Sequence, residues 1–406
     1  MSEETLLVLL SGDDRPGVSS ALFDAIAEVG AEVLDLEQVV VRGHLTLALL
    51  LAAGPQDPRL RSVVEAAGAR LGLSVSVRSG TGDNAPRRSG RAAVVVIGMP
   101  LTARAVAAVT ARIAADGANI DRIRRLARYP VTTVELDVSG ADVDALRRSL
   151  AKEAAAQGVD IAVSAAGLAR RGRRLVVMDV DSTLIQEEVI ELLAAHAGRG
   201  AEVAEVTAAA MRGELDFAQS LRARVRTLAG LPESVLQEVR DAIRLTPGAR
   251  TLVRTLKRLG FTVALVSGGF LEIVDDLARE LGIDYAHANR LEIRDGVLTG
   301  KVVGDIVDRE GKAAALRRFA AAEQLPLSRT VAIGDGANDL DMLAAAGLGI
   351  AFNAKPAVRE QADTSVSVPY LDAVLYLLGI SREEVEDADE LDGTPTPAPE
   401  VLSRAP

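Results

Sequence analysis

Four short apolar runs in the second half of the chain end at turns or at polar residues. They are RLVVMDV, FTVALVSGG, RTVAIGDG and LGIAF, and helical sequence follows or separates them. This alternation predicts an α/β fold with a doubly wound parallel sheet, because a parallel strand needs a helical crossover to return to the same edge. Ligands of such sheets bind beyond the carboxyl ends of the strands, so the residues that follow these runs are the first candidates for a site.

Aspartates lie at the ends of the first and third runs, and a buried strand normally excludes them. Asp179 lies near the end of the first run and Asp181 directly after it, and Asp335 lies near the end of the third. A buried carboxylate without a partner costs several kcal/mol, so aspartates at these strand ends indicate a shared ligand. If the two strands are neighbours, Asp179 and Asp335 offer the hard oxygen ligands that Mg²⁺ prefers, and the metal lets them stay ionised.

Donors for an anion follow the second run. Ser267 and Gly268 combine a hydroxyl with a backbone N–H at the start of the next helix, and Lys312 in REGKAAAL adds a cation. A carboxylate nucleophile, a second acid, a metal and phosphate donors are the groups that phosphoryl transfer through an aspartyl-phosphate requires. The alternative is a structural α/β domain whose aspartates are incidental.

The motifs DVDST, SGG, a later lysine and GDGAND, in this order, resemble those of the haloacid-dehalogenase-like phosphohydrolases. The resemblance covers residues 172–380 and implies a Rossmann-like core. It implies that Asp179 is the nucleophile and that Asp181 is the general acid and base, which also gives a backbone carbonyl to the metal. It assigns the metal-binding carboxylate to Asp335, an outer acidic residue that supports the metal site to Asp339, and a position near the phosphate to Asn338.

Largely helical sequence separates the first strand from the second, between about residues 187 and 247. Proteins of this superfamily carry a cap at this point, which lies over the active site and contacts the leaving group. The stretches IQEEVIELLA and GELDFAQSLRARVRTLAGLP within it closely resemble the phosphoserine phosphatases. That resemblance implies that Glu188 binds the substrate ammonium, that Arg224 pairs with its carboxylate, and that Met211 and Phe217 line the pocket.

Other roles remain open for these cap residues. Glu188 is also the type of residue that a helix dipole favours in a first turn. Arg222 and Arg226 lie in the same predicted helix as Arg224, and Phe217 could belong to the core. A pair of opposite charges nevertheless favours a zwitterionic amino acid, because a guanidinium binds a carboxylate in a bidentate manner.

The first half of the chain contains an internal repeat. ALFDAIAEVGAEVLDLEQ aligns with AVTARIAADGANIDRIRR at an offset of 87 residues, which places Gly30 on Gly117. Each copy reads as a strand, a helix, two strands, a second helix and a last strand, and this β-α-β-β-α-β order predicts a ferredoxin-like α+β module. We place the two modules at residues 1–80 and 92–168, with a linker over residues 81–91.

These modules resemble a tandem pair of ACT domains, which sense amino acids. The resemblance is carried by DDRPGV in the first copy, where Asp13 and Gly17 would meet a ligand such as serine. Gly17 lets the backbone approach a ligand, and free N–H groups at a helix start favour a carboxylate. The second copy has GMPLTAR there, with Arg104 where the offset places Gly17. ACT domains imply a homodimer, and the alternative is that they serve only in dimerisation.

Composition restricts the partners. The formal net charge is −11, and the chain has four tyrosines, six phenylalanines and no tryptophan, which argues against nucleic-acid binding. The absence of cysteine excludes disulfides and suits a reducing cytoplasm, and no apolar run is long enough to cross a membrane. Seven acids between Glu383 and Asp392 precede a Pro-rich end, so we expect a solvated, disordered tail over residues 381–406.

Together these features predict an Mg²⁺-dependent enzyme that hydrolyses O-phospho-L-serine through an aspartyl-phosphate, the last step of serine synthesis, under control of an amino acid bound to the ACT modules. Another phosphorylated amino acid or a phosphoprotein is the alternative substrate, although a peptide lacks both charged groups at the phosphorylated residue. A non-catalytic amino-acid sensor is the alternative of another class, and it would require a broken catalytic set.

Overall fold

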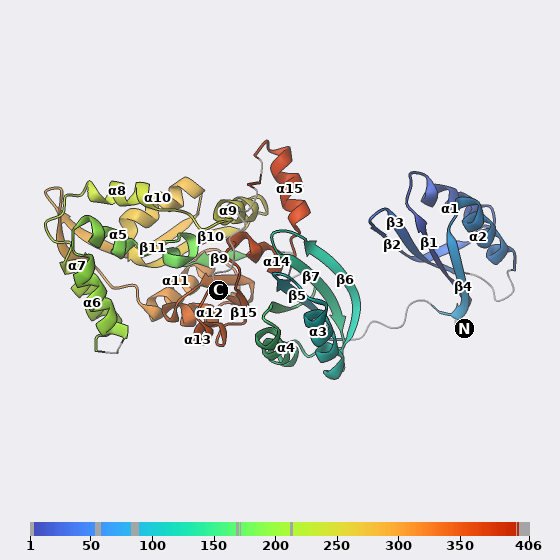
Figure 1. Cartoon of the computed structure of the whole chain (residues 1–406), viewed down its shortest axis with the longest axis horizontal. Helices are drawn as coiled ribbons and strands as arrows, with labels where there is room; N and C mark the ends of the chain where they lie inside the picture. Colours follow the sequence, from blue (N-terminus) through green and yellow to red (C-terminus); the bar gives the residue numbers. More distant parts are fainter. Residues whose placement is uncertain are drawn as a thin grey trace. The chain divides into compact units, whose positions relative to one another are not determined.

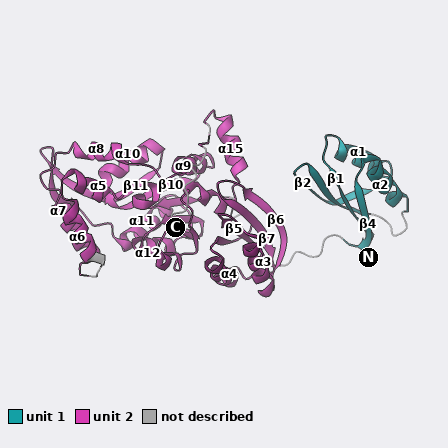
Figure 2. Ribbon diagram, in the orientation of Figure 1, with its two compact units in different colours: residues 1–87 teal, residues 88–406 magenta. Residues whose placement is uncertain are grey.

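The computed structural model describes residues 4–52, 58–82, 89–167, 170, 172–211, 214–394 and 396–397, without the side chains of residues 210 and 211. The chain divides into two compact units, residues 1–87 and 88–406 (Figure 2). The first unit holds one repeat, and the second holds the other repeat together with the C-terminal domain. Within the described ranges, no helix combines the length and the apolar character needed to cross a membrane.

The first repeat has the predicted ferredoxin-like topology, with an antiparallel sheet in the order β2-β3-β1-β4 (Figure 1). Alternation along β1 explains its core: Leu6, Val8 and Leu10 pack against the two helices, whereas Leu7 and Leu9 on the other face are half-buried. The elements are β1 (Glu4–Asp13), α1 (Val18–Ala27), β2 (Glu32–Val41), β3 (His44–Ala52), α2 (Pro58–Leu71) and β4 (Ser74–Thr81).

The second repeat has the same topology, with its sheet in the order β6-β7-β5-β8. Both faces of β5 are buried. Val94 and Val96 pack against α3 and α4, whereas Val95 and Ile97 join the core of the C-terminal domain. The second repeat is therefore built onto the domain that follows it. Its elements are β5 (Ala92–Gly98), α3 (Ala103–Ala115), β6 (Asn119–Ala127), β7 (Thr132–Ser139), α4 (Val143–Gln157) and β8 (Asp160–Ala165).

Hydrogen bonds reinforce this junction between the edge strands of two sheets. Asp160 at the start of β8 is buried, and it accepts hydrogen bonds from Ser365 Oγ at 2.6 Å and from Ser367 N at 2.7 Å. Thr364 Oγ1 donates to Ile161 O at 2.8 Å. These donors satisfy the oxygens of the buried carboxylate, so the bonds specify how the two sheets meet.

The apolar runs of the C-terminal domain form a seven-stranded sheet in the order β12-β11-β10-β9-β13-β14-β15. The neighbouring pairs are parallel except for the β11–β12 hairpin. This confirms the Rossmann-like core and makes the strands that precede Asp179 and Asp335 neighbours. The strands are β9 (Leu175–Met178), β10 (Thr262–Phe270), β11 (Tyr285–Arg294), β12 (Val297–Val303), β13 (Thr330–Gly334), β14 (Leu348–Phe352) and β15 (Thr364–Val366).

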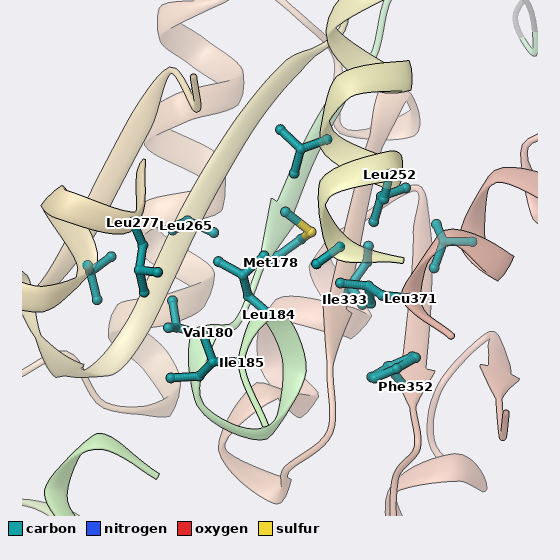
Figure 3. Packing of buried hydrophobic residues seen from close by; sticks show 14 of the residues in the cluster. Met178, Val180, Leu184, Ile185, Leu252, Leu265, Leu277, Ile333, Phe352 and Leu371 are labelled. Carbon is teal, nitrogen blue, oxygen red and sulfur yellow. The ribbon is translucent and has the colours of Figure 1, made fainter. Parts of the chain in front are cut away.

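Helices cover both faces of this sheet, which is why its central strands are apolar throughout. Met178 lies opposite Leu265 and Ile333 of the neighbouring strands, and Figure 3 shows these side chains on one face of the sheet with Leu252 of α9. The helices around the sheet are α9 (Ala249–Arg258), α10 (Leu271–Leu281), α11 (Arg309–Ala322), α12 (Leu340–Ala345), α13 (Pro356–Arg359) and α14 (Val374–Leu377).

The described part of the segment between β9 and α9, which was predicted to form a cap, contains four α-helices. A turn over Val180–Leu184 leads from β9 into them, and Asp216 begins the third with a capping box that includes Gln219. They are α5 (Val189–His196), α6 (Gly200–Met211), α7 (Phe217–Arg226) and α8 (Val235–Ala242).

The prediction of a disordered tail over residues 381–406 is wrong for its first part, which forms α15 (Arg382–Leu391). Ser381 and Glu384 form a capping box at its start. Asp389 is fully buried, and it accepts hydrogen bonds from Arg254 and Arg258 of α9. The acidic run reads as solvated by composition, but one acid in it has two arginine partners that the sequence places far away. Residues 398–406 lie outside the described residues.

Candidate active site

Asp179 lies just beyond the carboxyl end of β9 and is 3% exposed. Its backbone N–H still donates to Ile333 O of β13 at 2.9 Å, which fixes it at the edge of the sheet. Its carboxylate accepts from Val180 N at 2.8 Å and lies 2.8 Å from Lys312 Nζ. Burial and the neighbouring Asp339 raise the pKa of Asp179, and Lys312 opposes that rise. A neighbouring cation therefore favours the ionised form of the predicted nucleophile.

Lys312 is the buried cation that these carboxylates share. Its Nζ lies 2.8 Å from Asp179 Oδ1 and 2.7 Å from Asp339 Oδ1. Burial by itself would lower the pKa of the lysine, but the two carboxylates outweigh it and raise that pKa. Asp339 also accepts from Gly336 N at 2.9 Å, and a Cβ on Gly334 would lie only 2.4 Å from Asp339 Cγ. Glycine at that strand end is what lets the supporting acid approach.

Asp181 lies in the turn after β9, beside the segment that ends β10. Its carboxyl accepts from Val189 N at 3.0 Å and from Ser267 Oγ at 3.4 Å. Burial and the charge of Glu188 raise the pKa of Asp181 to about 7, although both hydrogen bonds oppose this. A carboxyl with a pKa near the working pH is populated in both protonation states, as a general acid and base must be.

Three carboxylates gather where a metal was predicted. Asp179, Asp335 and Asp339 each place a carboxylate oxygen within 4.8 Å of the others. Burial, together with the charges of Asp339 and Glu188, raises the pKa of Asp335 to about 6. A divalent cation would relieve this repulsion, and an all-oxygen donor set fits Mg²⁺. The side chain of Asp181 is not in this group, which agrees with a role for its backbone carbonyl instead.

Thr183 is a site residue that sequence reasoning missed. It is fully buried, and its Oγ1 donates to Asp335 Oδ1 at 3.2 Å. Thr246 Oγ1 in turn donates to Thr183 O at 2.7 Å, so the turn after β9 is held from two sides. The signal in the sequence was its place in the DVDST motif. A hydroxyl so close to two predicted site aspartates indicates a hydrogen-bonding role.

The cap segment contributes two charged residues to the site, Glu188 and Arg224. Glu188 precedes α5 without capping it, and its Oε1 accepts from Ser182 Oγ at 2.9 Å. Burial raises the pKa of Glu188 and lowers that of Arg224. The Nε of Arg224 is buried and has no hydrogen-bond partner among the described residues. Arg222 and Arg226, the alternatives on α7, are both exposed.

One cavity of about 450 Å³ brings the two sets together, since residues of the sheet edge and of the cap both line it. Ser267 and Asp339 are fully buried and do not line the cavity, but Ser267 donates a hydrogen bond to Asp181, which does. The side chain of Met211 lies outside the described residues. The predicted residues that line the cavity are Asp179, Asp181, Glu188, Phe217, Arg224, Gly268, Lys312, Asp335 and Asn338. The cavity is also lined by Ile190, Thr207, Leu215, Ser220, Leu221, Gly269 and Phe270, which the prediction did not include.

Phe217 and Gly268 meet across this cavity. Phe217 is the first residue of α7, and a Cβ on Gly268 would lie 3.1 Å from its Cζ. Phe217 therefore belongs to the wall of the site, and the absent side chain at position 268 is what allows the cap to come so close to the sheet.

The predicted ligand site of the first repeat lies at the start of α1. Asp13 ends β1, and Gly17 precedes the helix with a left-handed φ of 91°. In the second repeat the residue before the helix is Thr102, whose side chain caps α3, and Arg104 lies within the helix. The offset of 87 thus misplaces the counterpart of Gly17. A helix start already capped by threonine has fewer free N–H groups for a ligand.

Three segments of the chain match models of known families. A model of the haloacid dehalogenase-like hydrolases matches residues 176–344, and models of the ACT domain match residues 4–78 and 91–164.

Similar proteins cover nearly the whole chain. A phosphoserine phosphatase of Streptomyces coelicolor is 64% identical over 95% of either chain, and phosphoserine phosphatase SerB2 of Mycobacterium tuberculosis is 54% identical over 96% of either chain. The crystal structure of a probable phosphoserine phosphatase from Vibrio cholerae, in unliganded form, is 37% identical with a TM-score of 0.57 and covers 74% of this chain and 88% of that one. The chain belongs to the phosphoserine phosphatase family, as a haloacid dehalogenase-like hydrolase preceded by two ACT domains.

Proposed function

We propose that this chain hydrolyses O-phospho-L-serine to L-serine and inorganic phosphate through an aspartyl-phosphate on Asp179. The proposal rests on one observation: the cavity sets an anion, Glu188, and a cation, Arg224, near the carboxylate nucleophile. A substrate carboxylate would give the buried Nε of Arg224 a partner, and an unpaired buried donor is costly. The ammonium of the same substrate would neutralise Glu188, whose charge burial disfavours.

The chain's own residues carry both chemical steps. In the first, an oxygen of Asp179 attacks phosphorus, the bond from phosphorus to the serine oxygen breaks, and Asp181 gives its proton to the departing alkoxide. In the second, water attacks phosphorus, the bond from phosphorus to Asp179 breaks, and Asp181 takes a proton from the water. Asp181 returns to its first protonation state, which a pKa of about 7 allows at neutral pH.

The phosphoryl group would be held by Lys312, the hydroxyl of Ser267, Gly268 and Asn338. The ammonium of Lys312 is placed to balance charge on the phosphoryl oxygens, because it already touches Asp179. Mg²⁺ bound by Asp179, Asp335 and the backbone carbonyl of Asp181, with Asp339 in support, would draw further charge from these oxygens.

Two other substrate classes compete with this proposal. A phosphoprotein fits poorly, because a peptide has neither an ammonium nor a carboxylate at the phosphorylated residue to pair with Glu188 and Arg224. Phosphothreonine carries both charges and differs by one methyl group, a difference that apolar contacts discriminate only modestly.

The N-terminal repeats would supply regulation. We propose that an amino acid, with serine as the first candidate, binds at Asp13 and Gly17 of the first repeat. We also propose that the chain forms a homodimer through its ACT domains and works in the cytoplasm. The left-handed Gly17 before α1 supports the ligand site. Equilibrium dialysis with labelled serine and sedimentation of the full chain would test these two points. A monomer, or a chain that takes up serine only in the catalytic cavity, would contradict them.

The catalytic proposal is tested by a substrate panel, assayed with and without Mg²⁺. We expect O-phospho-L-serine to be hydrolysed best, ahead of O-phospho-L-threonine, O-phosphoethanolamine and a phosphoserine peptide, and activity to disappear with a chelator. The Asp179→Asn variant should lose turnover, whereas Asp305→Asn, which changes an exposed acid, should not. Equal rates on the peptide and the free amino acid would overturn the assignment of substrate, and full activity of Asp179→Asn would overturn the covalent step.

A further inference from the structure

Asn289 lies on β11 and is 1% exposed, and backbone groups of the site bind both ends of its amide. Its Nδ2 donates to Gly268 O at 2.8 Å, and its Oδ1 accepts from Val307 N at 2.8 Å. Turning the amide over would set donor against donor and acceptor against acceptor, so the two bonds define its orientation. The stretch YAHANRL around it has no part in the chemistry described above.

The carbonyl of Gly268 needs this partner because β10 and β11 part at that point. Their pairing shifts register between Val266 and Phe270, so the peptide from Gly268 to Gly269 lies outside the regular ladder. The N–H of that same peptide donates to Ser267 Oγ at 2.7 Å. The peptide is therefore held at its carbonyl by Asn289 and at its N–H by the serine hydroxyl.

The N–H of this peptide restricts where the hydroxyl of Ser267 can point. The oxygen already accepts the N–H of Gly269, so its own hydrogen remains for an acceptor in the site. Asp181 Oδ2 is such an acceptor at 3.4 Å. A rotation of the peptide would carry the hydroxyl away from Asp181 and from the phosphoryl group, although Asn289 itself touches neither.

The other end of the Asn289 amide reaches the start of α11. Val307 directly precedes Asp308, the N-cap of that helix, and Asp308 Oδ1 accepts from Gly311 N at 2.9 Å. Lys312 N donates to Asp308 O at 2.9 Å. Asn289 thus joins the first turn of the lysine helix to the turn that carries Ser267.

We propose that Asn289 is a positioning residue of the phosphate site, which fixes the Ser267–Gly269 turn and the start of α11 relative to each other. The inference rests on the proposed function and adds a residue to it. Its effect belongs to the phosphate end of the substrate, because Glu188 and Arg224 are held by the cap helices α5 and α7.

The test compares Asn289→Leu and Asn289→Ala with wild type in the full chain loaded with Mg²⁺. Leucine preserves size and removes both hydrogen bonds, and alanine serves if leucine does not fold. Thr330→Val is the matched control, because Thr330 is fully buried and joins Leu327 O to Gly347 N at the opposite end of β13. Inhibition by inorganic phosphate and by L-serine is measured beside turnover and circular dichroism.

For the Asn289 variants we expect a loss of about 100-fold in kcat/KM and a rise of about tenfold in the phosphate inhibition constant, with the L-serine constant within about twofold. Thr330→Val should have a kcat/KM and inhibition constants for phosphate and L-serine close to those of the wild type. Folded Asn289 variants with unchanged phosphate inhibition, or with equal losses for phosphate and serine, would overturn the inference. A wild type without activity on O-phospho-L-serine would instead overturn the proposed function, so the two failures are distinct.

Discussion

Buried charge is concentrated at one edge of the large sheet, where Asp179 and Asp339 each lie within hydrogen-bonding distance of Lys312. Two carboxylates share one ammonium there, and Asp335 adds a third carboxylate nearby. A phosphoryl group brings further negative charge, so residues alone do not balance the site and a divalent cation is chemically reasonable. In the cap, Glu188 offers an anion to an ammonium. The buried Nε of Arg224, which has no hydrogen-bond partner among the described residues, offers a donor to a carboxylate.

The role of Arg224 can be isolated with two substrates that differ in the carboxylate it is proposed to bind. Arg224→Ala should lower kcat/KM for O-phospho-L-serine by about 30-fold, because a charge-assisted hydrogen bond is worth about 2 kcal/mol. O-phosphoethanolamine retains the ammonium and lacks the carboxylate, so its kcat/KM should hardly change. Steady-state kinetics on both substrates give the answer.

Arg222→Ala is the control for that measurement, since Arg222 is an exposed arginine on the same helix. If Arg224→Ala lowers kcat/KM equally for both substrates, the guanidinium stabilises the cap and does not bind the substrate carboxylate.

Among the elements, α15 shows how a charged segment becomes ordered. Burial alone would raise the pKa of Asp389, but hydrogen bonds from Arg254, Thr396 and Arg258 outweigh it and lower that pKa to about 2. Arg254 Nε lies 2.9 Å from Asp389 Oδ1, and Arg125 of β6 pairs with Glu383 of α15 at 3.1 Å. The helix is therefore tied both to α9 and to the second repeat.

Asp389→Asn should lower the free energy of unfolding by about 2 kcal/mol at pH 7, since a carboxyl pKa of about 2 in the folded chain lies below about 3.9 in the unfolded chain. A carboxyl group whose pKa is lowered by folding stabilises the folded chain fully at pH values above its pKa in the unfolded chain. This contribution is lost as the pH falls through its pKa in the folded chain. The difference between variant and wild type should thus be complete above about pH 5 and shrink toward pH 2.

Urea unfolding at several pH values measures that difference. Asp387→Asn removes an exposed acid of the same helix and should have almost no effect. A difference for Asp389→Asn that does not change with pH would show that the ion pairs are not its source.

Elements differed in how far the sequence could predict them. Runs such as RLVVMDV are apolar because both faces of a central strand are covered, and the aspartates after them stand out against that background. The short β15 and the hairpin strand β12 carry no such contrast. The start of α15 had a readable sign in the Ser381–Glu384 capping box, but Asp389 depends on arginines of α9. Asn289 gave no sign, because its role is defined by two backbone groups distant in sequence.

At the scale of the whole molecule, the two repeats share a topology and differ in what covers the sheet face opposite their helices. In the second repeat, Val95 and Ile97 of β5 are about 1% exposed within the core of the catalytic domain. In the first, Leu7 and Leu9 of β1 are half-buried. The division of the chain into residues 1–87 and 88–406 follows from that difference.

Val95→Asp should lower the free energy of unfolding of the catalytic unit by about 4 kcal/mol, because it buries a carboxylate without a partner. Leu9→Asp, at the matching position of the first repeat, should change that free energy by less than about 1 kcal/mol, because Leu9 is half-buried and belongs to the other compact unit. Phosphatase activity followed during urea unfolding reports the catalytic unit in both variants. Equal sensitivity at the two positions would contradict the shared core of the second repeat and the catalytic domain.

The burial of β5 on both faces also limits how far the sequences of the two repeats can diverge. A swap of strand sequences between the copies would put Ser11 where Ile97 is enclosed, and the hydroxyl would find neither water nor a companion there. Substitutions on that face of the first copy need to suit only its own unit, whereas in the second copy they must also fit the core of the catalytic domain.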